Sequence, residues 1–188
     1  MTCIVGLTDK NKVYIGGDAA SASAYSMRIS AVPKVFRNGP FVIGYTSSWR
    51  MGQILEHHLR IDESELPRAG NSLHEFMVCV FVEKVRDLFK ELGYSTVENN
   101  EETAGQFLVG CYGHLYYVDK DYQVNETING MDACGSGEDY ALGALYATKD
   151  TALNPYQRID TALEAAAEFC SVVRPPFRVL EIDEGLLP

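Results

Sequence analysis

Residues 2–18 read TCIVGLTDKNKVYIGGD and contain two short apolar runs, at 2–8 and 13–18, on either side of the polar cluster 9–12. A short polar cluster between two apolar runs is typical of a tight hairpin turn. We therefore expect the chain to begin with two antiparallel strands. Hairpin-linked strands cannot form the parallel sheet of a doubly wound fold, so this stretch favours antiparallel sheets.

The rest of the chain alternates between groups of strands and pairs of helices. Further strands are expected at 32–37, 41–46, 107–112, 115–118, 130–135 and 177–182. Helices are expected at 49–61, 72–92, 138–147 and 155–170. The acidic stretch 98–102 is expected to be solvated. This order predicts an α+β fold, a four-layer αββα sandwich of two antiparallel sheets flanked by helices, in one domain over residues 1–188.

Composition restricts the classes of partner. The formal net charge of −10 argues against nucleic acid, because nucleic-acid binders normally present basic patches. The five cysteines are scattered, without a CxxC pair or histidines at ligand spacing, so we expect no metal and no organic cofactor. The N-terminus has no basic region followed by a long apolar segment, and no apolar run is long enough to cross a membrane. A cytoplasmic location without membrane contact is therefore expected.

Thr2 follows the initiator methionine directly. Removal of Met1 would place a hydroxyl and an α-amine, with an intrinsic pKa of roughly 8, on the same residue. The amine could then accept the proton of the hydroxyl without a histidine. The simpler interpretation is that Thr2 only begins a strand, since β-branched residues favour extended backbone.

Three further features could support a nucleophile at Thr2. Asp18 ends the second apolar run, and Lys34 lies at the head of another predicted strand, where a buried lysine would need a partner. Neighbouring strands would bring the two together. Gly135-Ser136-Gly137 lies at a strand-to-helix junction and offers a hydroxyl and backbone donors close to a helix N-terminus.

These motifs resemble those of the proteasome β subunits and, more closely, of the bacterial HslV-type threonine peptidases. The shared elements are residues 2–5, residues 16–18, Lys34 and residues 135–137. The spacings of sixteen residues from Thr2 to Asp18 and thirty-two from Thr2 to Lys34 match the family pattern without a gap. The resemblance spans nearly the whole chain and implies the fold of the N-terminal nucleophile hydrolases.

The resemblance also implies a role for each motif residue. Thr2 would attack a peptide or amide carbonyl, with its own α-amine as base and then acid. Lys34 would favour the ionised nucleophile, and Asp18 would hold Lys34 in place. Ser136 would hydrogen-bond near the Thr2 amine and relay its proton.

Other family positions are less well matched. The backbone N–H that holds the oxyanion falls at Ser47, where the family usually has glycine. A modest apolar substrate pocket is expected from Ala20, Val32 and Thr46. The Asp and Ser pair that proteasome subunits carry after the last helix cannot be matched to residues 170–174.

The resemblance further implies a peptide or unfolded-protein substrate, a homo-oligomeric ring and an ATP-dependent unfoldase as a possible partner. The helix at 72–92 would supply subunit contacts. The alternative is a catalytically silent, proteasome-like scaffold or assembly protein, favoured if Met1 is retained. Cys3 is better interpreted as a core residue, the four histidines as surface residues, and a triad of Ser136, His114 and Asp132 lacks the Gly-x-Ser-x-Gly elbow.

Overall fold

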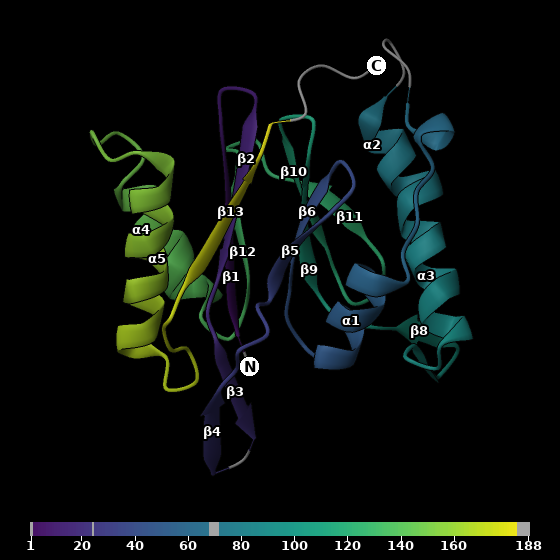
Figure 1. The fold of residues 1–188 in the computed structure, drawn as a ribbon, viewed down its shortest axis with the longest axis horizontal. Coiled ribbons are helices and arrows are strands. Elements are labelled where there is room, and N and C mark those ends of the chain that lie inside the picture. The colour runs from purple at the N-terminus through teal and green to yellow at the C-terminus, as the bar shows by residue number, and fades with distance from the viewer. Residues whose placement is uncertain (1, 24, 68–71, 184–188) are drawn as a thin grey trace.

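In the computed structural model, which describes residues 2–23, 25–67 and 72–183, two antiparallel sheets face each other between helical layers (Figure 1). The first sheet has the order β12-β1-β2-β13, formed by β1 Cys3–Asp9, β2 Lys12–Gly17, β12 Met131–Gly135 and β13 Arg178–Ile182. The second has the order β11-β10-β9-β6-β5, formed by β5 Val35–Asn38, β6 Phe41–Tyr45, β9 Phe107–Cys111, β10 His114–Val118 and β11 Val124–Glu126. The predicted αββα sandwich is confirmed.

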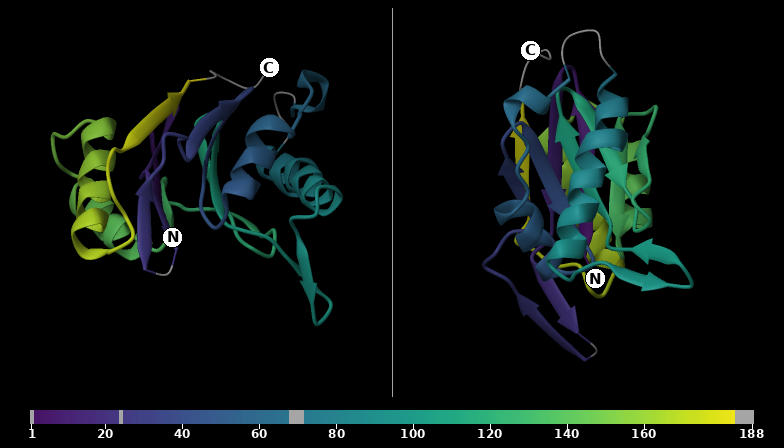
Figure 2. Two further views of the ribbon diagram at one scale, coloured as in Figure 1. Left: turned by 60° about the horizontal axis from the view of Figure 1, so that its bottom comes forward. Right: turned by 90° about the vertical axis from the view of Figure 1, so that its right-hand side faces the viewer.

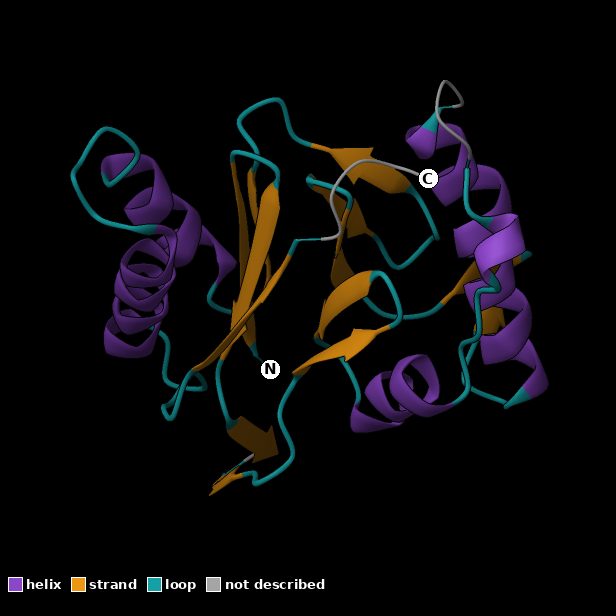
Figure 3. Ribbon diagram, turned by 45° about the horizontal axis from the view of Figure 1, so that its top comes forward, coloured by secondary structure: helices purple, strands orange, loops and turns teal. Residues whose placement is uncertain are grey.

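Helices cover the outer face of each sheet (Figure 3). The first sheet is covered by α4, Glu138–Ala147, and α5, Pro155–Phe169. The second is covered by α1, Trp49–His57, and by a longer helical segment made of α2 Leu73–Phe76, the π-helical turn Met77–Phe81 and α3 Val82–Glu91. Asn154 caps α5 through a capping box with Gln157, as the Asn-Pro signal predicts.

The alternation of side chains along β1 determines which way Thr2 faces. Cys3 is fully buried in the core shared with α4 and α5, whereas Ile4 is fully buried in the core between the two sheets. Side chains two residues apart along an extended strand lie on the same face. Thr2 therefore shares the face of Ile4 and points toward the second sheet, where it is buried.

The apolar side of the helical segment 73–91 is used inside the chain. Its large apolar side chains are buried in the core that also holds α1 and the second sheet: Leu73, Phe76, Met77, Phe81, Val82, Val85 and Phe89. This apolar stripe is therefore already buried within the chain. The expectation that the helix at 72–92 supplies subunit contacts stays a prediction, and it would fall on the exposed side of the helix.

Two short hairpins were not predicted. The strands β3, Ala20–Ser23, and β4, Ser26–Ile29, extend beyond the sandwich near the N-terminus (Figures 1 and 2). The stretch at 98–102 is exposed over 98–101, as expected, and it belongs to a second projecting hairpin, formed by β7 Thr96–Glu98 and β8 Glu101–Thr103. No helix in the described ranges is long and apolar enough to cross a membrane.

Candidate active site

Asp18 follows β2 directly and accepts four hydrogen bonds inside the protein. Its Oδ1 accepts from Cys3 N at 3.1 Å and from Lys34 Nζ at 2.8 Å. Its Oδ2 accepts from Ala20 N at 2.9 Å and from Arg174 N at 3.3 Å. A buried carboxylate is stabilised as an ion only when such donors replace water. The four bonds therefore fix the carboxyl group of Asp18 in position.

Lys34 lies immediately before β5 and points toward Asp18. Its side chain is 3% exposed, and its ammonium also donates to the carbonyl of Ala20. Burial lowers the pKa of Lys34 below the ordinary lysine value, while the neighbouring carboxylate of Asp18 opposes that shift. The pKa of Lys34 is therefore lowered by burial, but less than it would be without Asp18.

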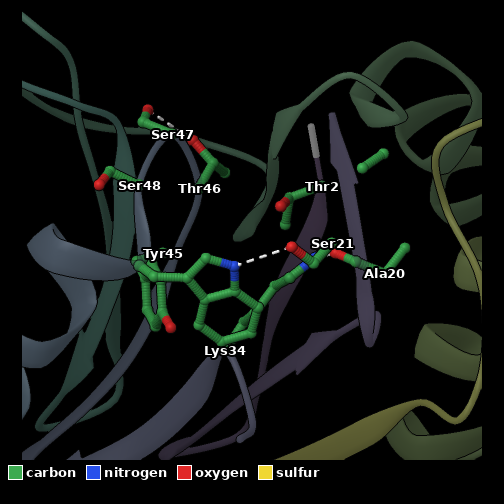
Figure 4. Close-up of a pocket in the computed structure, with 10 residues that line it drawn as sticks. Thr2, Ala20, Ser21, Lys34, Tyr45, Thr46, Ser47 and Ser48 are labelled. Atoms are coloured by element: carbon green, nitrogen blue, oxygen red, sulfur yellow. Dashed lines mark hydrogen bonds between the residues drawn. The ribbon is translucent and has the colours of Figure 1, made fainter. Parts of the chain in front are cut away.

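A cavity of about 100 Å³ brings Thr2 and Lys34 together (Figure 4). Its lining also includes residues of β3 and of the segment that connects β6 to α1: Ala20, Ser21, Ala22, Tyr45, Thr46, Ser47, Ser48 and Trp49. Figure 4 shows Thr2 on one side and Thr46, Ser47 and Ser48 on the other. The cavity therefore lies between Thr2, just before β1 of the first sheet, and residues 46–48, just after β6 of the second sheet.

Ser47 adopts a left-handed backbone conformation, with φ of 63°. A non-glycine residue pays a steric cost there, which explains why glycine suits this position. The serine side chain is held in place, because Ser47 Oγ accepts from Gln106 N at 3.2 Å and lies 3.1 Å from Thr46 Oγ1. Within the described residues, the Ser47 N–H has no acceptor, so it is available to a ligand in the cavity.

The Gly135-Ser136-Gly137 motif packs against the main chain of Thr2. Gly135 has φ of 100°, and a Cβ atom there would lie 2.4 Å from the Thr2 carbonyl oxygen, so only glycine fits. Gly137 N donates to that same carbonyl at 3.4 Å. Ser136 itself is exposed, lies in the turn before α4 and is not among the residues that line the cavity. The motif thus positions Thr2 through backbone contacts.

The remaining predicted site residues divide into two groups. Ala20 and Thr46 line the cavity, whereas Val32 is 50% exposed and is not brought to it. Trp49 was not singled out from the sequence, yet its indole donates to Ser21 Oγ at 3.2 Å and its ring lies 6.0 Å from Lys34 Nζ. Its position at the start of a helix after a site strand was the available signal.

The alternatives weighed from the sequence are disfavoured by position. Burial raises the pKa of the Cys3 thiol, and Asp18 adds to that shift, so Cys3 is a poor nucleophile. His114 lies 2.7 Å from Glu126 across β10 and β11 and so has a partner other than Asp132. Among the described residues, no group of three or more His, Cys, Asp or Glu side chains could hold a metal ion.

Comparison with known proteins supports the resemblance. No family model matches the chain. The chain is 27% identical over 185 residues to the ATP-dependent protease subunit HslV of Caldicellulosiruptor saccharolyticus, covering 96% of this chain and 98% of that protein.

Solved structures show the same fold. Thiobacillus denitrificans BPH in complex with Epoxomicin matches with a TM-score of 0.80 and 23% identity, over 100% of both chains. The eukaryotic HslV of Trypanosoma brucei matches with a TM-score of 0.73 and 19% identity, over 97% of this chain and 100% of that one. The resemblance predicted from the motifs is therefore confirmed: over nearly its full length the chain is similar to the HslV-type peptidases, and it has the fold of their solved structures.

Proposed function

We propose that this protein is a threonine-type N-terminal nucleophile peptidase of the HslV kind, active once Met1 has been removed. One observation carries the proposal: Thr2 lines the same small cavity as Lys34, which is buried and paired with Asp18. A lysine with a purely structural role would have no reason to lie beside Thr2, which after loss of Met1 would carry both a hydroxyl and a free α-amine. The similarity to the protease subunit HslV supports the same assignment.

The chemistry would proceed in two stages, formation of an ester to Thr2 and hydrolysis of that ester. Thr2 Oγ1 attacks the substrate carbonyl carbon while the α-amine accepts the hydroxyl proton. The carbonyl oxygen becomes an oxyanion that the free N–H of Ser47 can hold. The amine then gives the proton to the leaving nitrogen, the C–N bond breaks, and an ester to Thr2 remains. Water hydrolyses that ester, again with the amine as base, and frees the acid and Thr2.

Each surrounding residue has a physical role in this proposal. The positive charge of Lys34 favours the ionised oxygen of Thr2 and disfavours a second charge on the amine. Asp18 keeps that lysine charged and in place. Ser136 stays a predicted proton relay near the amine. The substrate would be a peptide or unfolded protein, with Ala20 and Thr46 at the small cavity.

The assembly is also part of the proposal. Like the relatives it resembles, the chain would form a homo-oligomeric ring in the cytoplasm, fed by an ATP-dependent unfoldase. Native mass spectrometry tests the ring, since a monomer at working concentration would contradict it. The formal net charge of −10 disfavours nucleic acid as a substrate.

Intact mass combined with a threonine-directed electrophile tests the nucleophile. The expected result is loss of Met1 followed by one adduct on wild type and none on Thr2→Ala. Cys3→Ala serves as the matched control, because it removes the adjacent nucleophile and should keep the adduct. An adduct that persists in Thr2→Ala would refute Thr2 as the nucleophile, whereas retention of Met1, or loss of Met1 without any adduct, would overturn the proposal in favour of a silent scaffold.

A further inference from the structure

Arg174 forms an unusual cluster at the end of α5. Its Nη1 donates to three main-chain carbonyl oxygens, those of Ala167 at 3.0 Å, Cys170 at 3.2 Å and Val173 at 2.6 Å. The last carbonyls of a helix lack partners within the helix, and the helix dipole makes that end negative. The positively charged guanidinium therefore binds these carbonyl oxygens and closes the turn at residues 170–174.

This turn lies directly behind the candidate active site. Arg174 N donates to Asp18 Oδ2 at 3.3 Å, and Ala19 N donates back to the Arg174 carbonyl at 3.0 Å. The two hydrogen bonds join the main chain of the turn to the Asp18-Ala19 segment in both directions. One of the four donors that hold the Asp18 carboxylate is therefore the main chain of Arg174.

The same turn also contacts the Gly135-Ser136-Gly137 motif. Cys170 Sγ lies 3.5 Å from the Ser136 carbonyl oxygen, and a Cβ atom on Gly137 would lie 3.0 Å from the side chain of Val173, which is fully buried. One five-residue turn therefore adjoins both segments that hold Thr2 and its charged partners.

We propose that Arg174 is a positioning residue: its guanidinium neutralises the carbonyl cluster at the end of α5 and so fixes the backbone donor that holds Asp18 against Lys34. Arg174 takes no part in bond making or breaking. The expected effect of Arg174 on catalysis rests on the proposed function, whereas its expected effect on the turn does not.

The chain offers a matched control for this role. Arg158 lies on α5 itself, is also partly buried and donates to a main-chain carbonyl, that of Leu145 at 3.0 Å, as well as to Thr148 Oγ1 and Met131 Sδ. It has no contact with Asp18. Arg158→Ala therefore removes an equivalent carbonyl-bound guanidinium from the same layer of the fold, without disturbing the turn at 170–174.

The first test needs no catalytic activity. In a Thr2→Ala background, hydrogen exchange at the Ala19 and Arg174 amides is measured for Arg174→Ala, Arg174→Lys and Arg158→Ala. The expected result is faster exchange at both amides in Arg174→Ala by about tenfold or more, as for local opening of a turn. Arg174→Lys is expected to lie between Arg174→Ala and the parent. Unchanged exchange in Arg174→Ala, or equal acceleration in Arg158→Ala, overturns the proposal.

The second test uses the rate of adduct formation at Thr2 as a function of pH. Arg174→Ala is expected to lower this rate by about 10- to 100-fold, the usual cost of a misplaced active-site group. The pH at which this rate falls on the alkaline side should be lower, since the Asp18 carboxylate raises the pKa of Lys34 and a displaced Asp18 does so less. The neighbouring Cys3 thiol, whose own pKa is raised by burial, stays uncharged where Lys34 titrates. Arg158→Ala should leave both the rate and its pH dependence as in wild type.

Chemical rescue separates charge from shape. Guanidinium chloride at a few millimolar is expected to restore much of the rate in Arg174→Ala, whereas urea, which is planar but neutral, is not. Equal rescue by urea, or a wild-type rate and pH profile in Arg174→Ala, overturns the positioning role. A wild-type protein that forms no adduct at all contradicts the proposed function instead, while the exchange experiment still decides on the turn.

Discussion

Two lysine–carboxylate pairs in this protein have similar geometry and opposite surroundings. Lys34 Nζ lies 2.8 Å from Asp18 Oδ1 inside the sandwich, with side chains 3% and 0% exposed. Lys84 Nζ, on α3, lies 2.6 Å from Glu65 Oε2 at the surface, with side chains 37% and 29% exposed. Only the inner pair lies beside a cavity that contains Thr2.

The difference shows that surroundings, and not distance, give a charge pair its role. Water competes for the surface pair, so its contribution to folding is small and depends on salt. The inner pair has lost water, and its lysine has a lowered pKa because of burial. A lysine and a carboxylate therefore form an ordinary surface contact in one place, whereas in the other the carboxylate and the burial together set the pKa of the lysine.

The largest expected effect comes from breaking the inner pair. Lys34→Met leaves the buried Asp18 without its countercharge, so the free energy of unfolding should fall by about 3–5 kcal/mol. Adduct formation at Thr2 should also be lost. Urea unfolding and intact mass measure the two effects. The double variant Lys34→Met with Asp18→Asn should regain much of the stability and none of the reactivity; full stability in the single variant would contradict the buried-pair interpretation.

Two glycine substitutions, compared with each other, test how tightly the region around Thr2 is packed. Gly135→Ala forces a Cβ against the Thr2 carbonyl at a φ of 100°, so the free energy of unfolding should fall by about 1–3 kcal/mol. Gly143→Ala, in α4 with open space around it, should raise that free energy by about 0.5–1 kcal/mol. Thermal and urea unfolding of both variants measure the difference, and equal responses would show that the contact with Thr2 is loose.

The pH dependence of stability sharpens the comparison further. Because the pKa of Lys34 is lower in the folded protein, the unfolded chain binds the extra proton between that value and the ordinary value of about 10.4. Stability due to Lys34 should therefore rise with pH across this window, by at most about 1.4 kcal/mol per pH unit. Urea unfolding of wild type minus that of Lys34→Met isolates this contribution. A difference that falls with rising pH would mean a raised pKa.

The smallest expected effect comes from breaking the surface pair. Lys84→Met removes a pair that water and salt already screen, so the melting temperature should stay close to that of wild type at about 0.15 M salt. Reactivity at Thr2 should not change. Scanning calorimetry at low and high salt measures this, and a loss as large as that of Lys34→Met would remove the distinction between the two pairs.

The central sandwich could be predicted because its strands and helices have clear periodic patterns. The apolar runs of β1, β2, β6 and β9 and the capped helix α5 are of this kind. The hairpin of β3 and β4 was missed because it lies largely outside the core and its alternation is weak: β3 contains only alanine and serine, and the apolar side chains of β4, Met27 and Ile29, are exposed. The two strands pair because the chain reverses its direction between Asp18 and Lys34, and no local sequence pattern marks that reversal.

The site was predictable only as far as spacing and residue type allow. Thr2, Asp18 and Lys34 were named from their positions, and two of them, Thr2 and Lys34, line one cavity. The left-handed backbone of Ser47 is not indicated by serine itself, which does not favour it; the available signal was the glycine usual at this position in the family. The roles of Trp49 and Arg174 depend on tertiary contacts with distant segments, so single-residue patterns could not show them.

The contacts of Thr2 have a consequence for the choice of nucleophile. Gly137 N binds the carbonyl of residue 2, and Asp18 binds the N–H of the next residue, so the main chain alone sets where the side chain at position 2 begins. That position is independent of which hydroxyl or thiol stands there. Serine or cysteine at position 2 would enter the cavity from the same point, so the backbone sets where that side chain begins, and the sequence sets which atom it carries into the cavity.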